Sequence, residues 1–299
     1  MTTKRNFSGE IALLTTALIW GSGFIGVDYC LEVGFPPSMI NMLRFMIGAA
    51  AMLIIINKKI VTFTKAEIKT GMIAGFFFFV GFHFQAIGMQ TIEVSSNALL
   101  TATNLLMVPF ICRLVFKERI PGRVYLAVFA CFFGIAVLNW SDSGFTLRIG
   151  DILTLICAFG FACHIAYLGY AGGGNKNTMN LTFIQLFTVG VLSAIYFFFF
   201  ENTTVAVSNW GIGIAAVMYL ALFPTALCMF LQTFGQKRTA TSKSAILLSL
   251  ESLFGAAFSV LLGLEPKTIN LLVGGSIIFL SVLWLEWRNS KSTTGEMLS

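Results

Sequence analysis

Charged residues are scarce in this sequence. Asp, Glu, Lys and Arg make up only 11% of its 299 residues, whereas 57% are hydrophobic, and the mean hydropathy is +0.86. Soluble domains carry about 25% charged residues, so the composition excludes a soluble fold and indicates a membrane protein. The apolar stretches take up almost the whole chain, so the function is expected to lie inside the bilayer.

Residue patterns that support catalysis are also missing. The sequence has two histidines, no HExxH, no CxxC and no GxxxxGK[ST] phosphate-binding loop. Its six cysteines lie in or beside apolar stretches, where a thiol is most often a packing residue. We therefore expect no enzyme activity, no metal and no cofactor, ATP included.

Long apolar runs are what the chain has instead. A helix that crosses a bilayer needs about 20 mostly apolar residues. The first such run follows Lys4 and Arg5 and is about twice as long as the apolar part of a signal peptide, so it is expected to be retained. The sequence predicts an all-α integral membrane protein with ten transmembrane helices. They cover roughly residues 10–29, 38–56, 70–90, 95–116, 123–140, 149–170, 178–200, 210–233, 241–263 and 268–287.

Basic residues predict how the chain is oriented. With a cytosolic N-terminus, 16 of the 19 Lys and Arg fall on the inner side, two on the outer side and one, Arg44, within a span. Because cytosolic loops are rich in Lys and Arg, both termini are expected in the cytosol of a multi-pass protein of the cytoplasmic membrane, the inner membrane of a bacterial cell. The net charge of +6 then reflects topology and anionic lipid headgroups, and no nucleic acid partner is expected.

An internal repeat organises the chain. A shift of 147 residues places residues 84–100 on 231–247 and matches Gln85 with Gln232 and Gly88 with Gly235. A shift of 141 residues aligns the openings of the two halves in the same way. We therefore expect two five-span units, residues 1–140 and 141–290, followed by a cytosolic tail at residues 291–299.

The second unit is expected to be inverted, because five is an odd number of spans. The loop charges agree: four lysines follow the second span, at positions 58, 59, 65 and 69, whereas the equivalent loop at residues 201–209 has no Lys or Arg. Two inverted five-helix repeats around a site at the membrane midplane permit alternating access.

Polar residues deep in these spans mark a candidate site. Asn97, Thr101 and Asn104 have the spacing of one helix face, and the repeat matches Asn104 with Glu251. Both of these positions lie about ten residues into their spans, roughly 15 Å deep. A charged Glu at that depth costs about 2.5 to 3.5 kcal/mol on insertion scales, so Glu251 is expected to face a cavity or a partner helix. The two asparagines suit either a solute or interhelical hydrogen bonds.

Five further side chains complete the candidate set. His83 and His164 are expected either to carry a coupled proton or to form neutral bonds between helices. Trp20 and its repeat mate Phe161 are expected either to flank a solute or to pack, and Gln232 adds an amide. No metal site is expected among them. Arg44 is expected to anchor its helix at the membrane interface by extending its side chain to the headgroups.

Several segments together resemble the EamA-like family of the drug/metabolite transporter (DMT) superfamily. They are ALIWGSGFIGVDY in the first span, GFHFQAIGMQTIEVSSNALLTATNLLMVPF over spans three and four, GDILTLICAFGFACHIA at the start of the second half and SAILLSLESLFGAAFSVLLGLEP over span nine. The family's acidic residue in span nine is usually followed by proline, whereas Ser252 follows Glu251 here. Glu118 and Glu265 match acidic residues that the family places at helix ends, where they are topology and packing signatures.

The resemblance implies a secondary transporter, commonly an exporter of amino acids or related metabolites, with a cavity lined by spans one, three, four, six, eight and nine. The expected partners are a small amphipathic solute, a possible coupled proton and the lipid bilayer. An importer of a small amine or heterocycle and a passive channel remain alternatives. Substrate identity and oligomeric state stay open at this point.

Overall fold

The computed structural model describes residues 8–56, 62–116, 122–141, 144–171, 176–201, 205–236, 238, 241–266 and 268–296. Within these ranges the chain is helical apart from turns and a two-residue antiparallel strand pair, β1 (Trp140–Ser141) and β2 (Gly144–Phe145). The helices of the first half are α1 (Ser8–Glu32), α2 (Pro37–Ile56), α3 (Lys65–Gly88), α4 (Val94–Thr101), α5 (Asn104–Phe116) and α6 (Gly122–Leu138).

The second half of the chain is also made of consecutive helices. Its elements are α7 (Ile149–Ala171), α8 (Thr178–Tyr196) with the π-helix η1 (Phe197–Glu201), α9 (Trp210–Leu220), the π-helix η3 (Ala221–Leu227), α10 (Cys228–Gln236), α11 (Thr241–Leu261) and α12 (Ile269–Glu296). Over the described residues, seven helical segments are long and apolar enough to cross a membrane, and three shorter apolar helices accompany them. The fold is therefore that of an all-α, multi-pass membrane protein. The last helix continues to Glu296, into the segment expected to be a tail.

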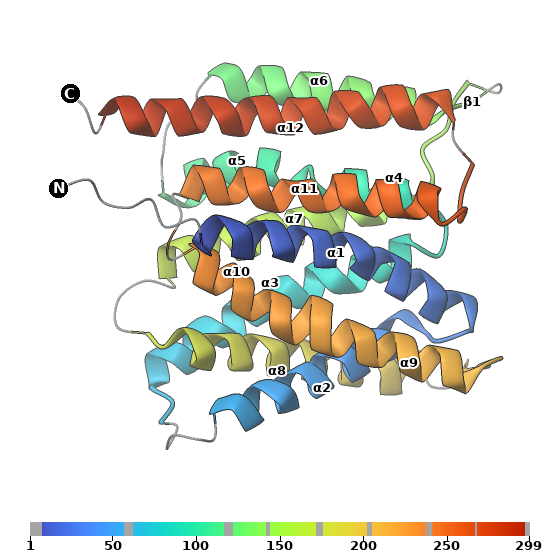
Figure 1. Cartoon of the computed structure of the whole chain (residues 1–299), viewed down its shortest axis with the longest axis vertical. Coiled ribbons are helices and arrows are strands. Elements are labelled where there is room, and N and C mark those ends of the chain that lie inside the picture. Colours follow the sequence, from blue (N-terminus) through green and yellow to red (C-terminus); the bar gives the residue numbers. More distant parts are fainter. Residues whose placement is uncertain are drawn as a thin grey trace.

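Helices of the two halves interleave throughout the bundle (Figure 1). α3 packs on α7, α1 on α11 and α10, α2 on α8, and α6 on α12. The α6 and α12 pair lies at the top of the view, while α2, α8 and α9 lie at the bottom. Since each of these contacts joins one half to the other, the core is shared between the halves.

The fourth span is not one continuous helix. Around residues 102–106 the backbone hydrogen-bond pattern changes from i−4 to i−3. The amides of Thr103, Leu105 and Leu106 donate to carbonyls three residues earlier. Pro109, which lacks an N–H, follows within the next turn. Asn97 and Thr101 therefore lie on α4 and Asn104 on α5, so the three residues do not share the face of one continuous helix as expected.

A second irregular span contains Pro224. The proline lies within η3, between α9 and α10. Proline cannot donate to the preceding turn, and a π-helical segment absorbs the missing bond. The helix that contains Pro224 is therefore irregular at this point.

Small residues let two helices approach closely beside the centre of the bundle. A Cβ on Gly21 of α1 would lie 2.5 Å from Phe254 Cβ and 2.9 Å from the Gly255 amide nitrogen of α11. Gly263 has a different role, because its φ is +73° and a Cβ there would meet nothing within 4 Å. The amide of Leu264 donates to Ser259 O, so Gly263 ends α11 in the left-handed conformation typical of a helix C-terminus.

Candidate functional site: a central cavity

A cavity of about 140 Å³ lies within the bundle. This volume is close to the roughly 150 Å³ of an engineered cavity that holds benzene in another protein, so it suits a ring-sized solute. Its walls come from the six spans that the family resemblance implied, with α2 in addition. The lining residues are Trp20, Gly23, Phe24, Val27, Arg44, Phe78, Phe82, Gln85, Ala102, Asn104, Leu105, Phe161, His164, Ile165, Pro224, Gln232, Leu248 and Glu251.

Six of the eight candidate residues meet at this cavity: Trp20, Asn104, Phe161, His164, Gln232 and Glu251. They come from five different spans, two of them in residues 1–140 and four in residues 141–290. The structure places the remaining two, His83 and Asn97, elsewhere.

Trp20 is held in a fixed orientation. It is the middle residue of α1, and its indole Nε1 donates to the Pro224 carbonyl at 2.7 Å. Gly23, one turn later on α1, faces the Pro224 ring, which a Cβ would approach to 3.3 Å. The indole is thereby tied to the irregular segment of the opposite half, with its ring in the cavity wall.

An aromatic cluster forms another wall. Phe161 packs on Phe78 and Phe82 with ring centroids 5.7 and 5.0 Å apart. Gly81 makes room for this packing, because a Cβ there would lie 2.3 Å from the Phe161 ring. Such edge and tilted ring contacts contribute about 0.5 to 1.5 kcal/mol each beyond buried area, so this wall is well ordered.

His164 joins the same wall. Its imidazole stacks on Phe78, with centroids 4.4 Å apart, and its Nε2 lies 2.7 Å from Gln185 Oε1. Gln185 itself donates to Leu181 O at 3.1 Å. His164 therefore lines the cavity and is also bonded between helices, which is one of the two roles expected for it.

Glu251 and Asn104 are the polar residues that the repeat relates. Glu251 is the middle residue of α11, and Asn104 begins α5 just after the helix break. Within the part of the chain that is described, the Glu251 carboxyl makes no hydrogen bond or ion pair with protein. An acid at that depth without a protein partner is costly, so its counterpart is expected to be a solute group or a proton.

Arg44 was not predicted as a site residue. The interface-anchor interpretation is wrong, because its side chain is 4% exposed and lines the cavity. Nε donates to Thr225 Oγ1 at 3.1 Å, and the guanidinium lies 4.6 Å from the Phe82 ring centroid. A cation over a desolvated ring gains about 2 kcal/mol, whereas burial of an ion costs several kcal/mol. The ring contact alone therefore does not offset the cost of burying Arg44. One signal for this role is its place as the eighth residue of α2, too deep for a terminal anchor.

Gln85 also lines the cavity, as its repeat mate Gln232 does. Its Nε2 donates to Thr101 Oγ1 at 3.3 Å. The sequence identified the pair of amides through the repeat, but only Gln232 was selected as a candidate.

Asn97 lies between helices, away from the cavity. Its Nδ2 donates to Thr154 Oγ1 at 2.8 Å and to Gln85 O at 3.2 Å, and its side chain is fully buried. This is the interhelical bond that was one of its two expected roles. Asn97 thus ties α3 and α4 to α7.

His83 belongs to a separate polar group. Its Nδ1 lies 3.2 Å from Ser38 Oγ, and Ser38 donates its amide and its hydroxyl to Glu201 at 2.9 and 3.2 Å. Phe79 and Tyr196 cover the imidazole. The carboxylate satisfies the first turn of α2, so this group joins the start of α2 to the end of the α8 and η1 helix.

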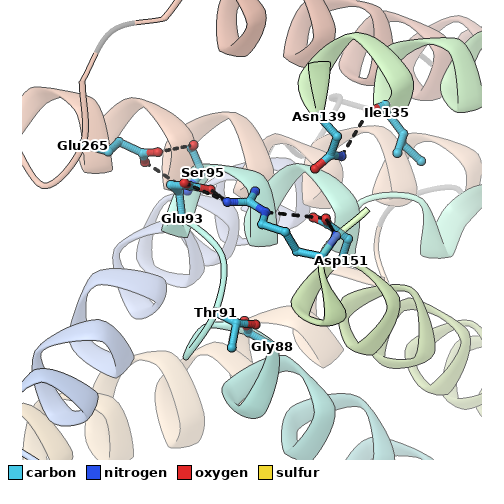
Figure 2. Close-up of polar contacts among 9 residues, drawn as sticks. Gly88, Thr91, Glu93, Ser95, Ile135, Asn139, Asp151 and Glu265 are labelled. Atoms are coloured by element: carbon cyan, nitrogen blue, oxygen red, sulfur yellow. Dashed lines mark hydrogen bonds and ion pairs between the residues drawn. The ribbon is translucent and has the colours of Figure 1, made fainter. Parts of the chain in front are cut away.

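The end of the bundle where α4 begins carries a polar network (Figure 2). Ser95 donates its amide and hydroxyl to Glu265 at 3.1 and 2.6 Å. Nearby, Arg148 bridges Glu93 at 2.7 Å and Asp151 at 3.7 Å. Glu265 caps α4 in this way, which matches the packing role that the resemblance gave it; Glu118, its repeat mate, lies outside the described residues. No group able to hold a metal occurs among the residues that are described.

Comparison with known proteins identifies relatives along the whole chain. The EamA-like transporter family matches twice, over residues 7–140 and 148–287. A protein of Archaeoglobus fulgidus named "Uncharacterized transporter" is 33% identical over 285 residues, which cover 93% of this chain and 86% of the relative. The "Uncharacterized transporter YyaM" of Bacillus subtilis is 25% identical over 91% of this chain and 92% of its own length.

A crystal structure of another protein shares the fold. It covers 92% of this chain and 95% of its own, with a TM-score of 0.65 at 18% identity. At that identity the likeness shows the architecture alone.

Proposed function

The chain belongs to the EamA-like transporter family, and on that premise we propose that it is a secondary active exporter of a small amphipathic solute such as an amino acid. The observation that carries this proposal is the central cavity, which combines aromatic walls with an unpaired acid, amides and a cation contributed by both halves. A cavity of about 140 Å³ has room for one small solute.

Each cavity residue has a part in this proposal. Trp20 and Phe161 flank the apolar portion of the solute, held by the Pro224 carbonyl and by the Phe78 and Phe82 rings. Asn104 and Gln232 donate to its polar atoms, and Glu251 binds an ammonium group or exchanges a proton with the solute. His164 fixes the aromatic wall through Gln185.

The architecture proposed for this transporter is ten spans in two inverted repeats, residues 1–140 and 141–290. One support is the family match, which occurs once in each half of the chain. The other is that equivalent helices make equivalent contacts. The contact of α1 with α11 corresponds to that of α7 with α4 and α5, and the contact of α3 with α7 corresponds to that of α10 with α1. Figure 1 adds that α1 begins and α12 ends at the same end of the bundle. We place that end on the cytosolic side of the cytoplasmic membrane, because 16 of the 19 Lys and Arg of the sequence fall on the side of the N-terminus when the ten spans are counted.

In alternating access, the contacts between the two halves break at one end of the bundle while the contacts at the other end stay formed. At the end that we place outside, Glu265 binds Ser95 and Arg148 binds Glu93. At the opposite end, Glu67 accepts the Asn177 amide at 2.7 Å. We expect the contacts of these three carboxylates to break and re-form during the transport cycle.

The test is an untargeted comparison of metabolites inside and outside cells that overproduce the wild type or Glu251→Gln. We expect at least one compound to accumulate outside only with the wild type. Expression in the membrane is matched by immunoblot, and Glu32→Gln, at the exposed end of α1, serves as control. Accumulation inside the cells would favour an importer instead, and flux that does not saturate would favour a channel.

A further inference from the structure

The solute can be specified further from the one cation in the described cavity lining, and this step rests on the proposed transport function. We infer that Arg44 is the anion-binding residue of the cavity and that the solute carries a carboxylate. The sequence left an amino acid, a small amine and a heterocycle open, and a carboxylate selects the first of these.

The position of Arg44 is the first argument. It is the eighth residue of α2, about 10 Å from the start of the helix, and its side chain is 4% exposed. It reaches neither end of the bundle but faces the same cavity as Trp20 and Glu251. A lipid-facing or interface role does not account for this placement.

The unpaired charge is the second argument. Among the residues that the structure describes, Arg44 forms no ion pair and makes one side-chain hydrogen bond, through Nε to Thr225. Guanidinium has five N–H donors and stays protonated in proteins. Its two terminal nitrogens offer the parallel pair of donors that matches a carboxylate.

The surroundings fix the guanidinium in place. Nε is held by Thr225, and the Phe82 and Phe45 rings lie 4.6 and 4.9 Å from its carbon centre. Thr225 belongs to η3, whose Pro224 carbonyl holds Trp20. The anion site and the aromatic wall therefore share one irregular segment, so a carboxylate on Arg44 is placed beside the ring of Trp20.

Glu251 does not cancel this charge. It lines the same cavity, but the two residues form no ion pair with each other. When Glu251 is ionised, the cavity offers one charge of each sign and suits a zwitterion. When Glu251 is protonated, the charge of Arg44 remains and still favours an anionic group.

The probes for the test are pairs of compounds that differ only in the carboxylate. The purified full chain is incubated with the twenty standard amino acids, their primary amides and their decarboxylated amines, and retained compounds are measured by mass spectrometry. We expect the wild type to retain acids at least about tenfold over the matching amides, the usual effect of a charge-assisted hydrogen bond. This comparison needs no variant.

Variants assign the preference to Arg44. Arg44→Gln is expected to reduce the preference for acid over amide to about twofold or less, and Arg44→Lys to keep part of it, because the charge remains without the paired donors. Arg113→Gln, at an exposed arginine in the last turn of α5, is expected to behave as the wild type. Melting temperature and elution volume show that each variant is folded.

Three results would overturn the inference: retention of amides or amines as strongly as acids, an unchanged preference in Arg44→Gln, or retention of none of the compounds. The export experiment separates this failure from that of the proposed function. If cells export a compound that lacks an anionic group, the transporter stands and the role of Arg44 is rejected. If there is neither export nor retention, both are rejected.

Discussion

Trp20 donates its indole N–H to the carbonyl of Pro224 at 2.7 Å. The two residues are 204 positions apart and lie in opposite halves of the chain. The bond sets the indole plane in the cavity wall, and it uses a carbonyl from an irregular segment of helix. A solute that stacks on Trp20 is therefore sensitive to the geometry of both halves.

Replacing Trp20 by Phe tests this relationship. Phe keeps an aromatic ring but loses the N–H, and a hydrogen bond contributes about 0.5 to 1.5 kcal/mol net. We expect the apparent KM for counterflow in proteoliposomes to rise about two- to twelvefold. Trp210→Phe is the matched control, because Trp210 is half exposed and packs on Phe35 outside the cavity. Equal KM values in the two variants would show that the bond plays no part.

Gly81→Ala tests the aromatic wall. A Cβ at this position would lie 2.3 Å from the Phe161 ring, so the ring must move, toward the cavity in our account. Overpacking of this kind costs about 1 to 3 kcal/mol, and we expect the melting temperature and the counterflow rate both to fall. The double variant Gly81→Ala with Phe161→Leu should recover the melting temperature. No recovery would mean that Gly81 serves another contact.

Much of the bundle could be predicted from the sequence, because the bilayer imposes a length on each apolar run. Each of the ten predicted stretches overlaps one to three of the observed helical segments. The bounds agree within about five residues except at the last stretch, where α12 continues to Glu296. Asn104 and Glu251, which the sequence repeat aligns, both line the cavity. These features follow from residue spacing alone, so one sequence was enough.

The irregular segments were harder to predict. The break after Thr101 depends on a switch from i−4 to i−3 bonds, which the apolar pattern does not record, so Asn97 and Asn104 were wrongly given one face. Arg44 was misassigned because a basic residue in a span usually reaches the interface. Its true position depends on Thr225 and Phe82, and sequence spacing carries no information about either contact.

Glu251→Gln tests proton coupling. The variant removes the titratable group and keeps the shape of the side chain. If Glu251 carries the coupled proton, counterflow of the exported compound in the variant should lose its dependence on pH between about pH 5.5 and 8.5, while the wild type retains it. A pH profile that is unchanged in the variant would mean that Glu251 only binds the solute.

Ser95→Ala tests the network in Figure 2. A hydrogen bond to a charged group contributes about 1.5 to 3 kcal/mol, so loss of the Ser95 hydroxyl should lower the melting temperature of the purified protein. Glu265→Gln should lower it as well, and the double variant should be less destabilised than the sum, because the two side chains contact each other. Strict additivity would show that the contact contributes nothing.

Asn104 and Asn97 provide the most direct test of the claim that the central cavity is the transport site. They are the same residue type, seven positions apart, and only Asn104 lines the cavity. The measurement is the apparent KM for counterflow of the exported compound by Asn104→Ala and Asn97→Ala. The account predicts about a tenfold rise for Asn104→Ala, and for Asn97→Ala a wild-type KM with a lower melting temperature. A wild-type KM for Asn104→Ala, or a rise only for Asn97→Ala, would contradict it.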